Sequence, residues 1–388
     1  MGRSRVGAPG LRALRSATPT SPRGPVRLLA LAALLLGAAA LLGTLGPRVF
    51  DGGSDAVPDA TAATPKHIGI PAPPEPKRVA PTIFVAPGAT GEDCTAAAPC
   101  GSLDAALGKA KPGAGVQLAA GRYGPQILKS DARPAGSAPV VVRPAPGAKV
   151  AFEELRCGPW TGDVGAGAFD LGGVTVAGVL IHRCDRVTLR RVTVAGGLFL
   201  EGSTNFAMVG GSVGPGADFH PDVSAVYGAQ PPIVPRNILF DGVRFHDWQV
   251  RTAGKHIECL QISDVQRLTV RGSSFVRCDT FDLHIAGTVG GPVRDVVIED
   301  NFFGATSDHS GVTPAYYSLS VRNGIGVHIT RNRSNQAWAL PAAGDVVQRW
   351  VLSRNVAPMK AYQCDDRITY MHNRWSRAKC GPTDRPTR

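Results

Sequence analysis

The chain has 388 residues, of which 47 are glycine, 32 proline and 8 cysteine, and its formal net charge is +12. Glycine is too rare for collagen, and a hydrophobic content of 43% is too high for a disordered chain, so both classes are excluded. Positive charge is a usual sign of nucleic-acid binding, and its position along the chain decides whether that function is tenable.

The N-terminal part has the pattern of a membrane signal anchor. Residues 1–27 include six arginines and no acidic residue, and residues 28–46 contain no charged residue. A helix over 28–46 reaches roughly 28 Å, which matches the hydrocarbon core of a bilayer. Because basic flanks stay inside, we predict a cytoplasmic tail over 1–27, a transmembrane signal anchor over 28–46 and an exported remainder. Residues 43–46 make a poor cleavage site, so an anchored protein is favoured, with secretion after cleavage as the alternative.

Residues 47–81 are rich in proline, alanine and glycine, and they predict an extended linker that buries little apolar surface. The folded domain is therefore expected to begin near Thr82. The six arginines of the cytoplasmic tail account for half of the net charge. Since an exported domain meets no nucleic acid, we exclude nucleic acid as a partner.

All eight cysteines follow the predicted membrane segment, and export to an oxidising compartment favours disulfides. No Cys-x-x-Cys motif is present, which argues against a zinc site. Sequential pairing is the most local connectivity, although sequence alone does not prove it. It predicts the bonds Cys94–Cys100, Cys157–Cys184, Cys259–Cys278 and Cys364–Cys380.

A weak nine-residue pattern of apolar residues recurs along the exported part. Its copies begin at residues 186, 205, 237, 267, 295, 326, 349 and 367. Each copy reads as two short strands joined by a turn, and such units close a core only when they coil and stack. Asparagine occupies the seventh position of the last four copies, because it tolerates a left-handed turn and bonds to a stacked neighbour. These residues predict an asparagine ladder: Asn301, Asn332, Asn355 and Asn373.

The start of the exported domain resembles the N-terminal cap of right-handed parallel β-helix proteins of the pectate-lyase-like superfamily. The resemblance is carried by residues 83–94 (IFVAPGATGEDC), 99–107 (PCGSLDAAL) and 120–123 (AGRY). It implies an all-β solenoid over 82–380 with an N-terminal capping helix, followed by a short tail over 381–388. The spacing of Leu103, Ala106, Leu107 and Ala110 suits the apolar face of that helix. The fold hosts lyases, hydrolases, epimerases and adhesins, so it does not fix an activity.

The densest polar cluster lies in residues 255–262 and 277–285. If Leu260 and Ile262 point into the coil, strand alternation turns Gln261 outward. The same alternation applies 23 residues later: if Leu283 and Ile285 point into the coil, Asp282 and His284 point outward. We therefore expect Gln261 and His284 to be stacked neighbours on one outer face.

One hypothesis for this cluster is β-elimination on a uronate-containing polysaccharide, which needs a base and a cation that holds the developing negative charge. Lys255 is the only lysine between residues 150 and 359, which makes it a candidate base. Carboxylates can bind Ca²⁺, and arginines or loop residues can hold the sugar chain. The catalytic candidates are Lys255, His256, Glu258, Asp282 and His284. The substrate-binding candidates are Gln261, Arg277, Arg322, Tyr316, Tyr317 and His220, and the calcium candidates are Glu258, Asp279 and Asp282.

Two alternatives remain open from the sequence. Glycoside hydrolysis needs two carboxylates, which Glu258 with Asp282 or Asp279 can supply, but the sequence motifs of polygalacturonases are absent. A non-catalytic surface protein can instead use the outer face of the solenoid to bind a glycan or a protein. In every case the expected partners are a polysaccharide and, through the N-terminal helix, a membrane.

Overall fold

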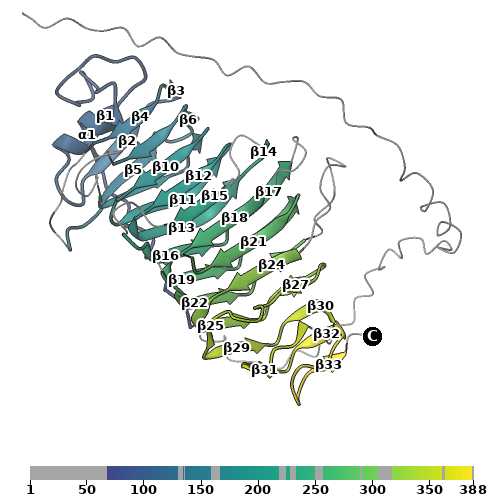
Figure 1. Ribbon diagram of the computed structural model, residues 1–388. Coiled ribbons are helices and arrows are strands. Elements are labelled where there is room, and N and C mark those ends of the chain that lie inside the picture. The colour runs from purple at the N-terminus through teal and green to yellow at the C-terminus, as the bar shows by residue number, and fades with distance from the viewer. Residues whose placement is uncertain are drawn as a thin grey trace, which may run out of the picture. The chain divides into compact units, whose positions relative to one another are not determined.

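The computed structural model describes residues 68–129, 134, 136–158, 167–217, 224–227, 233–249, 257–288, 291–304, 317–360 and 363–386. Within these ranges the chain forms a solenoid of stacked coils, with one helix at its N-terminal end (Figure 1). Its strands belong to two sheets, and the strands pair in parallel from the first coil of the described part to the last. This is a parallel β-helix, as the resemblance implies.

The smaller sheet, called the small sheet below, contains one strand from each of nine successive coils in the described part of the chain. Its strands are β4 (Gln126–Leu128), β7 (Leu155–Cys157), β10 (Val179–His182), β12 (Leu198–Glu201), β15 (Ser224–Tyr227), β18 (Glu258–Ser263), β21 (Phe281–Ala286), β24 (Tyr317–Arg322) and β27 (Trp338–Ala339).

The larger sheet, called the large sheet below, combines the remaining 24 strands of the described residues. Its N-terminal strands are β1 (Pro81–Val85), β2 (Gly115–Leu118), β3 (Gly121–Tyr123), β5 (Val140–Pro144), β6 (Val150–Phe152), β8 (Phe169–Gly172), β9 (Thr175–Val176), β11 (Val187–Val194), β13 (Thr204–Val213) and β14 (Gly216–Ala217). Its middle strands are β16 (Arg236–Asp241), β17 (Arg244–Gln249), β19 (Gln266–Arg271), β20 (Ser274–Cys278), β22 (Val293–Glu299) and β23 (Phe302–Phe303). Its C-terminal strands are β25 (Gly324–Thr330), β26 (Arg333–Ser334), β28 (Val347–Gln348), β29 (Trp350–Ser353), β30 (Val356–Lys360), β31 (Ile368–Met371), β32 (Arg374–Arg377) and β33 (Arg385–Pro386).

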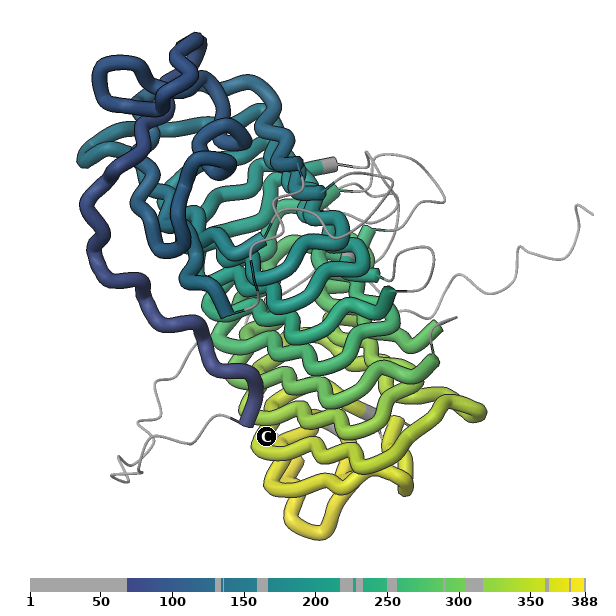
Figure 2. Tube along the Cα trace, turned by 90° about the vertical axis from the view of Figure 1, so that its left-hand side faces the viewer, coloured from purple at the N-terminus to yellow at the C-terminus, as the bar shows by residue number. Residues whose placement is uncertain are grey.

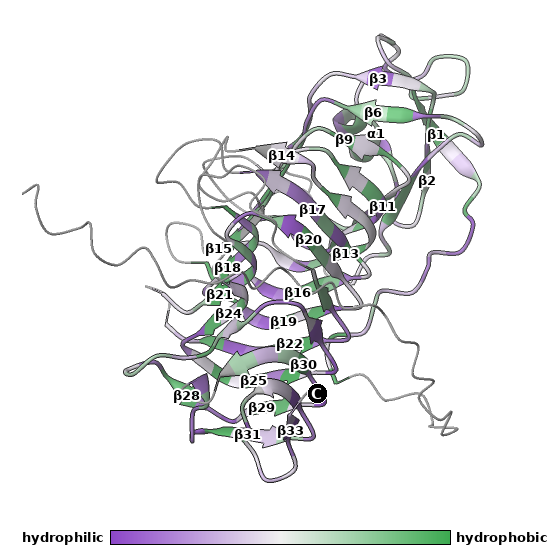
Figure 3. Cartoon of the chain, turned by 90° about the vertical axis from the view of Figure 1, so that its right-hand side faces the viewer, coloured by the Kyte–Doolittle hydropathy of each residue, from purple (hydrophilic) through white to green (hydrophobic). Residues whose placement is uncertain are grey.

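The core fills the interior of the coils, because side chains alternate between the inside and the outside of each strand. Hydrophobic and hydrophilic residues accordingly both occur along the strands (Figure 3). In the large sheet Phe275 stacks between Phe245 and Phe303, with ring centroids 4.8 and 5.1 Å away. Helix α1 (Leu103–Lys109) covers the N-terminal end of this core. It buries Leu103, Ala106 and Leu107, which confirms the predicted capping helix.

The repeat pattern found in the sequence coincides with the backbone bends of the coils. The first residue of seven of the eight copies has a positive φ, for example 59° at Arg267. The sixth residue has a positive φ in all eight copies, for example 55° at Arg331. The repeat therefore reports where the chain turns between strands.

The asparagine ladder is confirmed, with one difference in conformation. Asn332 donates from Nδ2 to Oδ1 of Asn355 at 3.1 Å, and its own Oδ1 accepts from Nδ2 of Asn301 at 3.0 Å. The left-handed residue is the one before each asparagine, such as Arg331, rather than the asparagine itself. Asn373 is the last asparagine of the ladder, and its Nδ2 donates to Oδ1 of Asp384 at 3.1 Å. The predicted tail over 381–388 is thus partly integrated into the solenoid, because Asp384 is buried and β33 pairs with β32.

The segment 68–80, called the strap below, differs from the predicted linker. It runs along the outer side of the large sheet before the chain enters β1 (Figure 2). Arg190 donates to the carbonyl oxygens of Pro73 and Pro74 at 3.0 and 2.8 Å, and Arg271 donates to that of Ile70 at 3.1 Å. A proline-rich segment thus attaches to the sheet through its carbonyl groups, without needing an apolar face of its own.

All four predicted disulfides are present, namely Cys94–Cys100, Cys157–Cys184, Cys259–Cys278 and Cys364–Cys380. The predicted tail and anchor over 1–46 lie outside the described residues. Within the described part of the chain, no helix has the length and apolar character that crossing a membrane requires.

Candidate functional site

Gln261 and His284 are direct neighbours on the outer face of the small sheet, as the sequence predicts. They are register partners in the parallel pair β18–β21, so their Cα atoms lie roughly 4.8 Å apart. Leu260 and Leu283 lie beside them in the chain and are fully buried in the coil. Gln261 and His284 are both partly exposed, which makes this pair accessible from outside.

Two aromatic rings lie beside this pair, Phe281 on the same strand as His284 and Tyr317 on the next coil. The ring of Phe281 lies 5.4 Å from the imidazole of His284 and 6.3 Å from the ring of Tyr317, measured between centroids. The rings of Phe281 and Tyr317 are nearly parallel, at 20°. The structure therefore places Tyr317, a predicted substrate-binding residue, close to the Gln261–His284 pair.

The small sheet carries a second row of polar side chains, which are not among the candidate site residues named from the sequence. His182 Nδ1 lies 3.0 Å from Oε2 of Glu201, and Glu201 is the register partner of Tyr227. These residues lie at the ends of β10, β12 and β15. The signal that locates them is the alternation along each strand, since each follows a buried inward-facing residue. The coil spacing is irregular there, which hides their alignment in the sequence.

Asp282 does not reach the surface, contrary to the expectation that it points outward with His284. Register places it between Cys259 and Ser318, and all three residues are fully buried. Neither carboxyl oxygen of Asp282 has a hydrogen-bond partner among the described residues. Burial raises the pKa of this carboxyl well above its ordinary value, so the neutral form is favoured. Alternation predicts the face of a strand, but it does not predict what covers that face.

The other candidate carboxyls are buried as well. Glu258 is 3% exposed and Asp279 is fully buried. In the described ranges, no group of three or more His, Cys, Asp or Glu side chains is arranged to hold a metal ion. The structure thus adds no support for calcium at Glu258, Asp279 and Asp282, and that site stays a prediction.

The two candidate arginines are already paired with carboxylates. Nε of Arg277 donates to Asp247, and this bond is the main reason that the pKa of Asp247 falls to about 2. Arg322 binds Asp345 through Nε and through Nη2, the latter at 3.0 Å. Arg277 also lies on β20 of the large sheet, away from the strand that carries His284. Neither partner aspartate is close to its arginine in sequence.

Four candidate residues cannot be placed, because they lie outside the described residues. These residues are Lys255, His256, His220 and Tyr316. The roles assigned to them from the sequence remain predictions.

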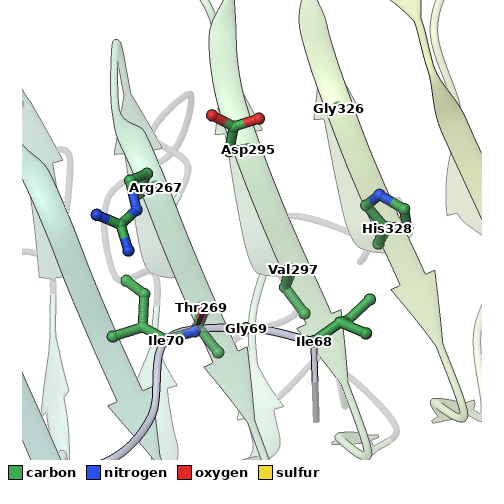
Figure 4. Close-up of a pocket in the computed structure, with 9 residues that line it drawn as sticks. All are labelled: Ile68, Gly69, Ile70, Arg267, Thr269, Asp295, Val297, Gly326 and His328. Carbon is green, nitrogen blue, oxygen red and sulfur yellow. Dashed lines mark hydrogen bonds between the residues drawn. The ribbon is translucent and has the colours of Figure 1, made fainter. Parts of the chain in front are cut away.

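A cavity of about 360 Å³ lies on the large sheet, where the strap crosses β19, β22 and β25 beside Arg267, Asp295 and His328 (Figure 4). Burial, together with the charge of Arg349, lowers the pKa of His328. The strap itself forms part of the wall, through Ile68 and Ile70. This cavity therefore reflects how the strap attaches, and it is separate from the Gln261–His284 face.

No family model matches the chain, and no curated protein matches it. Solved structures with a similar fold include pectate lyase Pel9A, with 11% identity and a TM-score of 0.45 over 80% of this chain and 79% of that one. An alginate lyase from Paenibacillus sp. str. FPU-7 has 15% identity and a TM-score of 0.45, over 78% of this chain and 97% of that one. PfbA, a surface adhesin of Streptococcus pneumoniae, has 14% identity and a TM-score of 0.40, over 74% of this chain and 83% of that one.

Proposed function

We propose that the protein binds a uronate-containing polysaccharide along the outer face of the small sheet and cleaves it by β-elimination. The observation that carries this proposal is the Gln261–His284 pair, which lies on an accessible face and continues into the Phe281–Tyr317 aromatic pair. An amide, an imidazole and aromatic rings in one row suit a sugar chain, which offers hydroxyl groups and apolar ring faces.

In this proposal His284 acts as the base. Its imidazole removes the proton next to the uronate carboxylate, a carbon–carbon double bond forms, and the bond to the glycosidic oxygen breaks. The leaving oxygen takes up a proton from water, so that the departing sugar is released as an alcohol. Histidine suits this role because its ordinary pKa lies near neutral pH. Gln261 positions the sugar through hydrogen bonds. Lys255 remains a second candidate base, with His256 beside it.

The buried carboxyls suit hydrolysis less well than elimination. A glycoside hydrolase needs one ionised and one protonated carboxyl across the scissile bond. Asp282 is inaccessible, and burial favours its neutral form. Glu258 is only 3% exposed. A sugar chain on the outer face therefore does not reach this pair of carboxyls.

The second candidate function is glycan binding without catalysis. The ion pairs of Arg277 with Asp247 and of Arg322 with Asp345 favour it, because they occupy the guanidinium groups that a lyase would aim at the substrate carboxylate. Elimination then needs His284 as the base, and it needs residues outside the described ranges to stabilise the developing negative charge.

We also propose that the solenoid functions outside the cell, tethered by the N-terminal segment. Four disulfides support an oxidising compartment. Secretion after cleavage is the alternative, and the mass of the protein recovered from membranes distinguishes the two.

The test is to incubate the purified protein with a panel of uronate-containing polysaccharides, with and without calcium, and to follow the ultraviolet absorbance of unsaturated uronate. New absorbance supports the lyase. Binding on a glycan array without new absorbance supports the non-catalytic function. Loss of product on chelation supports calcium, and an unchanged rate excludes it.

A further inference from the structure

A cavity of about 750 Å³ lies at the C-terminal end of the small sheet, beyond the Gln261–His284 pair. This volume is within the range of small-molecule binding sites. The cavity, called the end cavity below, is bounded on one side by Tyr317 of β24 and by Ala339 of β27. The other residues that matter here are Leu340, Pro341, Asp365, Asp366 and Arg367.

Tyr317 connects the end cavity to the proposed site. Its ring lines the cavity and lies nearly parallel to the ring of Phe281, whose other neighbour is His284. A sugar chain that passes His284 along this row therefore reaches the end cavity without leaving the sheet. An aromatic ring at that point offers a flat surface for the apolar face of a sugar.

The charges of the end cavity disfavour a uronate. Arg367 binds Asp365 at 2.6 Å, which neutralises that carboxylate. Asp366 is exposed and forms no salt bridge among the described residues, although its charge also acts on Arg367. Two carboxylates against one guanidinium leave an excess negative charge, which repels the carboxylate of a uronic acid.

The remaining lining suits an acetamido group. Leu340 and Pro341 provide apolar surface for a methyl group, and the carboxylate of Asp366 can accept a hydrogen bond from an amide N–H. An N-acetylhexosamine combines these features in one ring, since it has an apolar face, an amide donor and a methyl group, and it carries no charge.

We infer that the end cavity is a subsite for an N-acetylhexosamine, so that the polysaccharide contains this sugar as well as the uronate beside His284. This inference rests on the proposed function, because it takes the chain along the same outer face. It implies that a polymer of uronate alone is bound less well than one that alternates uronate with N-acetylhexosamine.

The test measures binding of the full-length protein to two oligosaccharides of equal length by calorimetry. One alternates glucuronate with N-acetylglucosamine, and the other contains galacturonate alone. We expect the alternating oligosaccharide to bind more tightly. Tyr317→Ala should weaken its binding roughly three- to tenfold, as for the loss of an aromatic contact, and should weaken binding of the galacturonate oligosaccharide by a smaller factor. Tyr317→Phe keeps the ring and should bind as the wild type does.

A second variant tests the charge argument. Asp366→Ala should weaken binding of the alternating oligosaccharide and strengthen that of the galacturonate oligosaccharide. Equal affinities of the wild type for the two oligosaccharides overturn the subsite, as does unchanged binding by Tyr317→Ala. If His284→Ala still weakens binding in that case, the proposed function survives without the subsite. If neither oligosaccharide binds the wild type, the proposed function fails and the subsite fails with it.

Discussion

Gln261 and His284 face outward from adjacent coils as register partners, while Leu260 and Leu283 beside them are fully buried. An amide and an imidazole are thereby held side by side on rigid strands, which fixes their spacing without any loop. The flanking Phe281 and Tyr317 rings extend this surface by one further coil. The proposed function depends on this row of side chains.

Gln261→Ala should weaken binding of a uronate oligosaccharide by about three- to tenfold, because it removes a hydrogen-bonding group from the outer face of the small sheet. Gln348→Ala is the matched control, since Gln348 is exposed on the large sheet and should leave binding unchanged. Equilibrium binding by calorimetry makes the comparison. If Gln261→Ala and Gln348→Ala lose the same amount of affinity, the ligand does not bind specifically on the outer face of the small sheet.

The buried asparagine ladder should be a major source of stability. Asn332 is 1% exposed, donates to the carbonyl of Ile298 and to Asn355, and accepts from Asn301. Asn332→Ala leaves several buried groups unpaired, so we expect the free energy of unfolding to fall by about 3 kcal/mol or more. Urea denaturation followed by circular dichroism measures it. The exposed Asn335→Ala is the control, and a similarly small loss in both variants would contradict this account.

The buried carboxyl of Asp282 should destabilise the fold as the pH rises. Its pKa is raised in the folded state, so folding favours the protonated form. The destabilisation is absent below the pKa of the unfolded chain, about 3.9, and grows until the pH passes the pKa of the folded state. Asp282→Asn should therefore be more stable than the wild type at pH 8 and close to it in stability near pH 4.

Thermal unfolding over this pH range measures the effect, with the exposed Asp93→Asn as the control. A stability difference between Asp282→Asn and the wild type that does not change with pH would show that the carboxyl is ionised and paired.

The strap should detach when Gly69 is enlarged. A Cβ atom at Gly69 would lie 2.5 Å from Oγ1 of Thr269, which is fully buried. In Gly69→Val we expect trypsin to cleave after Arg78 faster than in the wild type, because cleavage requires the strap to leave the sheet. Gly108→Ala meets no atom within 4 Å and should keep the wild-type rate. Equal rates in all three proteins would mean that the strap is not held by these contacts.

The sequence is sufficient to predict the features that depend on local periodicity. The repeat marks the bends at residues such as Arg267 and Arg331, and alternation around Leu260 and Leu283 is enough to pair Gln261 with His284. The four disulfides match the pairing of each cysteine with its nearest neighbour along the chain. These inferences need only the period of a strand and the length of a coil.

The features that the sequence does not predict depend on contacts between distant residues. Arg190 binds the strap through the backbone carbonyl oxygens of Pro73 and Pro74. Every residue has such a carbonyl, so this contact cannot be recognised from the residue types. The partners of Arg277 and Arg322 come from other coils. The burial of Asp282 depends on its neighbours in the stack rather than on its own strand.

The most direct test of the central claim compares the wild type with His284→Ala in the release of unsaturated uronate from a uronate-containing polysaccharide, followed by ultraviolet absorbance. If His284 is the base, the wild type forms product and the variant loses about a hundredfold or more of the rate, with unchanged thermal unfolding. Product formation at the wild-type rate by His284→Ala would contradict the account.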